Sequence, residues 1–111
     1  CCRARVPLVE AGVLAFSGML MTIVPGRTPC YRCLYPSPPR EGSVPTPAQA
    51  GIMGPLPGIF GSLEALEAIK LILGTGPGPS GRVLFFDGIA GGFDEVTVDR
   101  NPSCAACGGI G

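Results

Sequence analysis

The amino-acid sequence predicts a mixed α/β fold that forms a single unit over residues 1–111. Apolar runs of strand length stand before and after one long segment with helical periodicity. Two CxxC pairs, Cys30–Cys33 and Cys104–Cys107, have the spacing with which two thiols on one turn hold a metal ion. They predict that the two ends of the chain meet in space, with strands, loop and helix between them.

The first 25 residues predict short buried strands. Val6–Glu10 and Gly12–Phe16 are strand-like, and Met19–Val24 predicts a third strand. Ser17–Gly18 predicts the tight turn before that third strand. The stretch from Leu8 to Val24 is nearly all apolar, but it is shorter than the roughly 20 residues that cross a membrane. We therefore expect a buried hairpin and no membrane span.

Residues 36–50 predict an extended proline-rich loop. Five prolines fall between positions 36 and 47, and proline lacks the amide donor that helices and central strands need. The loop is too long for a simple connector, which indicates a lid, a binding arm or a flexible tether.

Residues 57–73 predict a helix with one apolar face. Five apolar side chains recur on that face at helical spacing: Ile59, Leu63, Leu66, Ile69 and Leu73. Pro55 and Pro57 predict an irregular first turn, Gly74 predicts an end cap, and alternating Gly and Pro at 76–79 prevent continuation. The charged residues are expected to form a solvated surface of the helix: Glu64, Glu67 and Lys70.

Two strands are predicted after the helix. Arg82–Phe86 is an apolar run of the kind that is covered on both faces of a sheet. Asp87–Gly88 predicts a turn, and Phe93–Val98 alternates in part, as a half-exposed strand does. Asn101–Pro102 then leads into the second CxxC pair.

The paired cysteines predict a metal site. Four thiolates from two such turns form a closed tetrahedral site, which is the usual form of structural zinc. The chain contains no histidine, so a site with four soft ligands consists of cysteine alone: Cys30, Cys33, Cys104 and Cys107. A rubredoxin-like iron site uses similar turns, and three disulfides among the six cysteines are the remaining alternative. The CxxC grouping, without a recognisable signal peptide, favours a metal in a reducing compartment, and we expect the cytoplasm.

Composition limits the range of functions. Only 14% of the residues are charged and 46% are hydrophobic, which indicates a segment of a larger protein. The net charge is zero, so no electrostatic footprint for nucleic acid is expected. Without histidine, the segment cannot build a Cys-His or Ser-His nucleophile of its own.

Five phrases of the sequence occur in an order typical of one family. They are RVPLV at 5–9, PCYRCL at 29–34, AGIMGPL at 50–56, GSLEALEAIK at 61–70 and RNPSCAACG at 100–108. Together they resemble the C-terminal half of the ThiF/MoeB/HesA family, bacterial relatives of ubiquitin-activating enzymes. The resemblance covers nearly the whole chain.

This resemblance implies both a fold and an activity. Its members are Rossmann-like adenylation domains with a mixed sheet, usually homodimers, that use ATP and magnesium to activate the C-terminal carboxylate of a ubiquitin-like sulfur carrier. The carrier then serves thiamin or molybdopterin synthesis. The resemblance makes Cys30, Cys33, Cys104 and Cys107 ligands of structural zinc, with zinc-binding turns at 29–36 and 100–108. It makes the loop at 36–50 an arm over the carrier's tail.

Two features bear on the chemistry. The nucleotide site is expected in the half of the family pattern that precedes these residues, because no glycine-rich turn here joins a strand to a helix. Gly74–Gly76 follows a helix and is not expected to bind phosphate. Pro47 stands where many members carry a loop cysteine, which puts a covalent step through this loop in doubt. A non-enzymatic zinc-knuckle binding module and a rubredoxin-like electron carrier are the alternatives.

Overall fold

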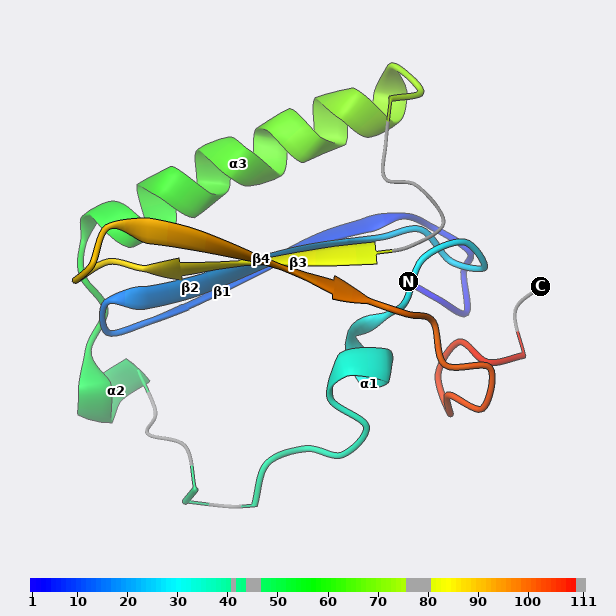
Figure 1. The fold of residues 1–111 in the computed structure, drawn as a ribbon, viewed down its shortest axis with the longest axis horizontal. Helices are drawn as coiled ribbons and strands as arrows, with labels where there is room; N and C mark the ends of the chain where they lie inside the picture. The colour runs from blue at the N-terminus through cyan, green and yellow to red at the C-terminus, as the bar shows by residue number, and fades with distance from the viewer. Residues whose placement is uncertain (41, 44–46, 76–80, 110–111) are drawn as a thin grey trace.

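The computed structural model describes residues 1–40, 42–43, 47–75 and 81–109, and it confirms the α/β fold class (Figure 1). Its elements follow one another as β1 (Leu8–Leu14), β2 (Ser17–Ile23), α1 (Tyr31–Leu34), α2 (Pro47–Ala50), α3 (Pro55–Ile72), β3 (Gly81–Asp87) and β4 (Gly92–Val98). Helix α3 lies over one face of the sheet, while α1 lies on the opposite side, toward the end of the sheet where the C-terminal turns also lie (Figure 1).

The four strands form one sheet in the order β1-β2-β3-β4, and all three pairings are antiparallel. The part of the sheet described is thus antiparallel and not mixed, with one isolated parallel bridge between Ala15 and Ile52. The connection from β2 to β3 explains this arrangement. It travels the length of the sheet through the loop and returns along α3, so that β3 starts at the end where β2 stops (Figure 1).

The predicted hairpin over Leu8–Val24 is confirmed, but its internal boundaries were wrong. Leu8–Leu14 is one strand, and the pairing of Leu14 with Ser17 moves the turn to Ala15 and Phe16. Ala15 takes a left-handed φ of 53° there. Its backbone is held by hydrogen bonds from Ala15 N to Gly51 O and from Met53 N to Ala15 O. These contacts with a distant segment could not be inferred from local composition.

No helix in the described part of the chain has the length and apolarity to cross a membrane.

Helix α3 is longer and more regular at its start than predicted. It begins at Pro55, because proline is accepted in the first turn, where its missing N–H would have no helical partner. The expected cap is confirmed: Gly74 has φ 76°, and Gly74 N and Thr75 N donate to Leu71 O and Lys70 O, which satisfies the last carbonyls. The Gly-Pro stop predicted at 76–79 lies outside the described residues.

The face of α3 that meets the sheet differs from the predicted one. Leu56 and Phe60 are buried against Leu20, and Leu63 packs beside them. We call Leu20, Leu56 and Phe60 the helix-side cluster. The other predicted face residues are partly exposed: Ile59 37%, Leu66 52%, Ile69 52% and Leu73 70%. Apolar side chains occupy most sides of this helix, so their periodicity did not single out the face that contacts the sheet.

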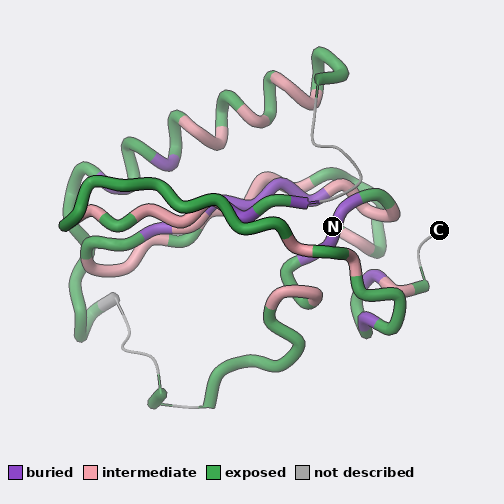
Figure 2. Tube along the Cα trace, in the orientation of Figure 1, coloured by how far each residue is buried: buried purple, intermediate pink, exposed green. Residues whose placement is uncertain are grey.

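The opposite face of the sheet carries a second core. Met21, Ile23 and Val83 are buried there together with Cys30, Cys104 and Cys107, and we call these six residues the cysteine-side cluster. Adjacent residues of β3 alternate between the two clusters, since Val83 belongs to one and Leu84 packs against the other. The prediction that this strand is covered on both faces is confirmed. Figure 2 shows buried segments along the inner strands and at the cysteine turns.

Part of the predicted loop at 36–50 is helical. Its last four residues form the one-turn helix α2, which begins at Pro47, and Gly51 with φ 74° follows it. Positions 41 and 44–46 of the predicted loop lie outside the described residues. Helix α2 lies near the end of the sheet that is farther from α1 (Figure 1).

Candidate metal centre

The structure brings the two CxxC pairs together although 74 positions separate them. The sulfurs of Cys30 and Cys104 lie 3.6 Å apart, those of Cys33 and Cys107 3.4 Å, and those of Cys30 and Cys33 3.9 Å. All four sulfurs lie within 4.8 Å of one another. The meeting of the chain ends inferred from the spacing of the cysteines is confirmed. We call this group the four-cysteine site.

A buried turn after β2 positions the first pair. The hydroxyl of Thr28, which is 1% exposed, accepts a hydrogen bond from Val24 N at 2.8 Å and donates to Pro29 O at 3.1 Å. Pro29 packs on the backbone of Gly81, where an added Cβ would lie 2.5 Å from the proline ring. The short helix α1 then places Cys30 and Cys33 on one side of a single turn.

A turn that requires glycine positions the second pair. Gly108 N donates to Cys104 O at 2.9 Å, which closes the turn around Cys107. A Cβ at position 108 would lie 2.5 Å from Pro102 O and 2.6 Å from Cys104 O. Neither the role of Gly108 nor that of Thr28 was predicted. The only sequence signal for Gly108 is a glycine directly after a CxxC pair.

The electrostatics of the site differ between its sulfurs. Burial opposes ionisation of Cys104, but N–H groups of Cys107 and Ala106 point at its sulfur, and they lower its pKa to about 6. Burial raises the pKa of Cys30, and the adjacent thiol of Cys107 raises it further. Burial is also the main cause of the raised pKa of Cys107. Cys104 is therefore the thiol that ionises most easily. The raised pKa values of Cys30 and Cys107 mean that all of these thiols are not expected to be ionised together without a bound cation.

Arg100 is the arginine that supports this site. Its guanidinium donates to the carbonyl of Cys107, and it also lowers the pKa of the Cys107 thiol. Arg32, which is also next to a cysteine in the sequence, donates instead to Pro36 O at 3.2 Å on the exposed side of α1. Asn101 N lies 3.5 Å from the sulfur of Cys33 and donates to it.

The donor set fits a tetrahedral metal ion. Zinc with four bonds to sulfur of about 2.3 Å separates its ligands by about 3.8 Å. Three of the sulfur pairs lie 3.4–3.9 Å apart, and all four sulfurs lie within 4.8 Å of one another. All six cysteines of the chain are described and none forms a disulfide. Cys1 is exposed, and Cys2 packs at the border of the cysteine-side cluster without joining the four.

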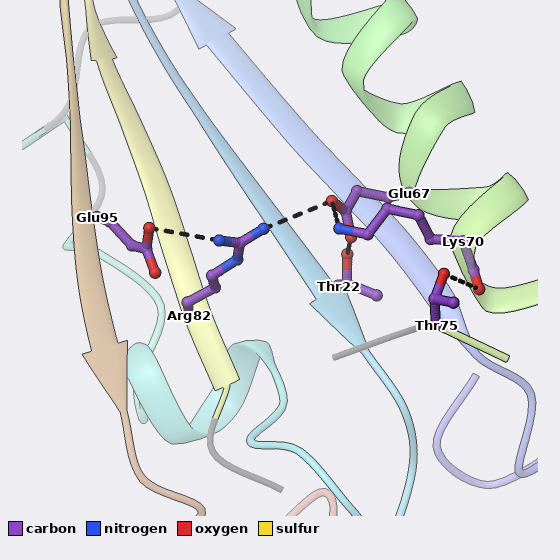
Figure 3. A network of polar contacts seen from close by, with 6 residues as sticks. All are labelled: Thr22, Glu67, Lys70, Thr75, Arg82 and Glu95. Atoms are coloured by element: carbon purple, nitrogen blue, oxygen red, sulfur yellow. Dashed lines mark hydrogen bonds and ion pairs between the residues drawn. The ribbon is translucent and has the colours of Figure 1, made fainter. Parts of the chain in front are cut away.

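A second polar group joins α3 to the sheet (Figure 3). Glu67 accepts hydrogen bonds from Thr22 at 3.0 Å and from Lys70 at 2.8 Å, and Arg82 lies 3.9 Å away. The Glu67 side chain is 13% exposed. The expectation of a solvated charged surface was therefore wrong for Glu67, because Thr22 and Arg82 on neighbouring strands supply partners that the helix sequence does not reveal.

The comparisons with known proteins place the chain in a family. Residues 1–106 match the ThiF family, and the chain belongs to it, as the five phrases predicted. It is 44% identical to the SAMP-activating enzyme E1 of Haloferax volcanii over 96% of this chain and 40% of that protein. It is 43% identical to a sulfur carrier protein adenylyltransferase of Thermus thermophilus over 92% of this chain and 40% of that protein.

A third relative is the adenylyltransferase and sulfurtransferase MOCS3 of Bos taurus, 44% identical over 97% of this chain and 24% of that protein. The chain thus spans a quarter to two fifths of the length of these relatives. Among solved structures, the Escherichia coli enzyme MccB aligns with a TM-score of 0.75 at 22% identity over 97% of this chain and 34% of that one. MccB in complex with N-formylated MccA aligns with a TM-score of 0.76.

Proposed function

We propose that the chain is the zinc-binding part of an adenylyltransferase that activates the C-terminal carboxylate of a ubiquitin-like sulfur carrier. The observation that carries this proposal is an identity of 43–44%, over more than nine tenths of the chain, with three proteins named as an activating enzyme or an adenylyltransferase, one of them for a sulfur carrier protein. The carrier is expected to serve sulfur transfer of the thiamin or molybdopterin type.

In the proposed reaction, a carboxylate oxygen of the carrier attacks the α-phosphorus of ATP and pyrophosphate leaves. Sulfide-level sulfur from a donor then attacks the acyl carbon of the adenylate, the bond from that carbon to the AMP oxygen breaks, and a thiocarboxylate and AMP are formed. ATP and magnesium are assigned to another part of the longer protein. In the described part of this chain, no strand runs through a glycine-rich turn directly into α3, which is the arrangement that holds phosphates at a helix N-terminus.

The role proposed for zinc is structural, with Cys30, Cys33, Cys104 and Cys107 as its ligands. Four thiolates leave no open position for water or substrate. The ion is therefore proposed to stabilise the fold and to take no part in the reaction of the carrier's carboxylate. Its ligands lie just after β2 and just after β4. The ion therefore fixes both ends of the unit that contains the loop, α3 and the last two strands, and its binding energy contributes to folding.

The loop before α2 is proposed to pass over the tail of the carrier. It starts beside the four-cysteine site and ends at α2, whose first residue is Pro47. Proline offers no nucleophile, so we propose direct attack of the sulfur donor on the adenylate instead of a covalent step through this position. Many members of the family carry a cysteine there.

The assembled protein is proposed to be a cytoplasmic homodimer. The outward side of α3 supports an assembled state, because Ile69, Ile72 and Leu73 are 52%, 83% and 70% exposed. Apolar side chains grouped in this way are normally covered by further protein. Analytical ultracentrifugation of the full-length protein tests this, and a monomer across the micromolar range would contradict it.

Carrier-dependent exchange of labelled pyrophosphate into ATP tests the proposed function. The full-length protein is assayed with a ubiquitin-like carrier from the same genome that ends in Gly-Gly. We expect exchange with the intact carrier and none with the same carrier lacking its last two residues. Absence of exchange with every such carrier would contradict the proposal and favour a binding module without enzymatic activity.

A further inference from the structure

A cleft lies at α1 and the start of the loop that follows it. It has a volume of about 500 Å³ and is lined by Tyr31, Arg32, Tyr35, Ser37, Pro38 and Pro39. We call it the tyrosine cleft. Its volume is in the range of sites that accept a bulky side chain or a small ligand. None of its lining residues is a cysteine of the metal site, so neither the metal nor the proposed adenylation chemistry accounts for it.

The walls of the tyrosine cleft are held in place. The rings of Tyr31 and Tyr35 contact each other with centroids 5.0 Å apart at an angle of 47°. Arg32 donates to Pro36 O and so folds the start of the loop against α1. Cys30 and Cys33 bracket Tyr31, and a metal on these thiols would fix the same turn. The rings are 42% and 39% exposed, which leaves apolar area free for a partner.

The cleft lies at the basic end of the molecule. Five of the eight basic residues are within the first forty positions, against a single acidic residue, Glu10. Arg3, Arg5, Arg27 and Arg32 belong to the N-terminal turn, the turn after β2 and α1, which gather at one end of the sheet (Figure 1). The other seven acidic residues follow position 40, and one of them, Asp99, also lies at this end because it directly follows β4. An acidic protein surface is the partner that complements this end.

We propose that the tyrosine cleft docks the folded body of the sulfur carrier, with an apolar side chain between the tyrosines and prolines and acidic residues facing Arg32. This rests on the proposed function and names the surface that selects the carrier. The cleft is continuous with the loop proposed to cover the carrier's tail, because Ser37, Pro38 and Pro39 belong to both. Rigid tyrosine rings beside arginine form the kind of surface that dominates binding energy at protein interfaces.

Steady-state pyrophosphate exchange by the full-length protein tests this docking role, with a Gly-Gly carrier from the same genome as the probe. For Tyr35→Ala we expect KM for the carrier to rise about tenfold, in the range of an interface anchor, with kcat and KM for ATP unchanged. Tyr35→Phe should restore the wild-type value. Arg32→Gln should raise KM for the carrier several-fold and flatten its salt dependence. Arg82→Gln, which removes an exposed guanidinium from the opposite face, is the matched control and should have no effect.

Several results would overturn the docking role. An active wild-type protein whose KM for the carrier is unchanged in both Tyr35→Ala and Arg32→Gln would show that the carrier binds elsewhere. A Tyr35→Ala protein with lowered zinc content or Tm, together with an unaffected Arg32→Gln protein, would make the cleft a packing feature. Absence of carrier-dependent exchange in the wild type would instead remove the proposed function, and the docking role with it.

Discussion

The two faces of the same four-stranded sheet are stabilised in different ways. On one face, Phe60 and Leu56 of an 18-residue helix bury Leu20. On the other, Met21, Ile23 and Val83 are covered by two short turns that bury Cys30, Cys104 and Cys107. The helix-side cluster is a conventional apolar core. The cysteine-side cluster depends on segments with almost no regular structure, in which α1 has only four residues.

This difference indicates where the metal matters. A helix of 18 residues can hold itself against a sheet by burying apolar area. A four-residue helix and an irregular C-terminal turn bury less apolar area, so we expect their order to depend on the metal ion proposed to join them. The four-cysteine site is therefore expected to control one half of the molecule far more strongly than the other.

Loss of the metal has the largest expected effect. Structural zinc contributes roughly 10–16 kcal/mol of apparent binding free energy in small zinc domains, so chelation or Cys104→Ser should unfold both cysteine turns. Hydrogen exchange followed by mass spectrometry should show that residues 24–40 and 99–109 lose protection while α3 and β2 keep most of theirs. Equal loss of protection in α3 and in the two cysteine turns would contradict the proposal that the metal stabilises mainly the cysteine side.

Phe60→Ala tests the opposite face. Phe60 is 1% exposed, and truncation of such a residue costs about 3–5 kcal/mol through lost burial and the remaining cavity. The melting temperature should fall while the zinc content per chain stays the same. A Phe60→Ala protein that lost its zinc would show that the two clusters fold as one unit.

Substitution of one glycine on each side of the sheet by alanine compares the effect of a single added methyl group in the two regions. Gly108→Ala would place a Cβ 2.5 Å from a backbone carbonyl, whereas Gly18→Ala would place one 2.2 Å from the ring of Phe60. Both substitutions should cost about 1–3 kcal/mol through overpacking. Only Gly108→Ala should weaken zinc retention in a competition with a chromogenic chelator. Gly109→Ala, with nothing within 4 Å, is the control and should match the wild type.

The smallest expected effect concerns Glu67. Burial works against its ionisation, but hydrogen bonds from Lys70 and Thr22 outweigh it and hold the pKa of Glu67 below its ordinary value of 4.5. A carboxylate with a lowered folded-state pKa stabilises the protein above the ordinary value and loses that contribution as the pH falls through the folded-state pKa. Glu67→Gln should cost about 1–2 kcal/mol at neutral pH.

Urea titrations between pH 7 and pH 3 measure this contribution. The stability of the Glu67→Gln protein should depend less on pH in the acid range than that of the wild type. Glu64→Gln, on the same helix, is the control and should keep the wild-type profile. Identical profiles for wild type and Glu67→Gln would mean that the network in Figure 3 adds no net stability.

Much of the cysteine side could be predicted from the sequence, because CxxC spacing is a local signal that specifies its own turn. The helix-side contacts could not. The residues of α3 that meet the sheet include Glu67, whose partners Thr22 and Arg82 lie on different strands. The supports of the site were missed for a similar reason. The need for glycine at position 81 is seen only in the structure, where Pro29, 52 positions earlier, packs against it.

The most direct test of the account is the metal content of the full-length protein, purified under reducing conditions without added metal and measured by plasma mass spectrometry. The account predicts one equivalent of zinc per chain from this site, lost when Cys30 and Cys104 are both replaced by serine. Iron with visible absorption, or no metal together with four free thiols at these positions, would contradict it.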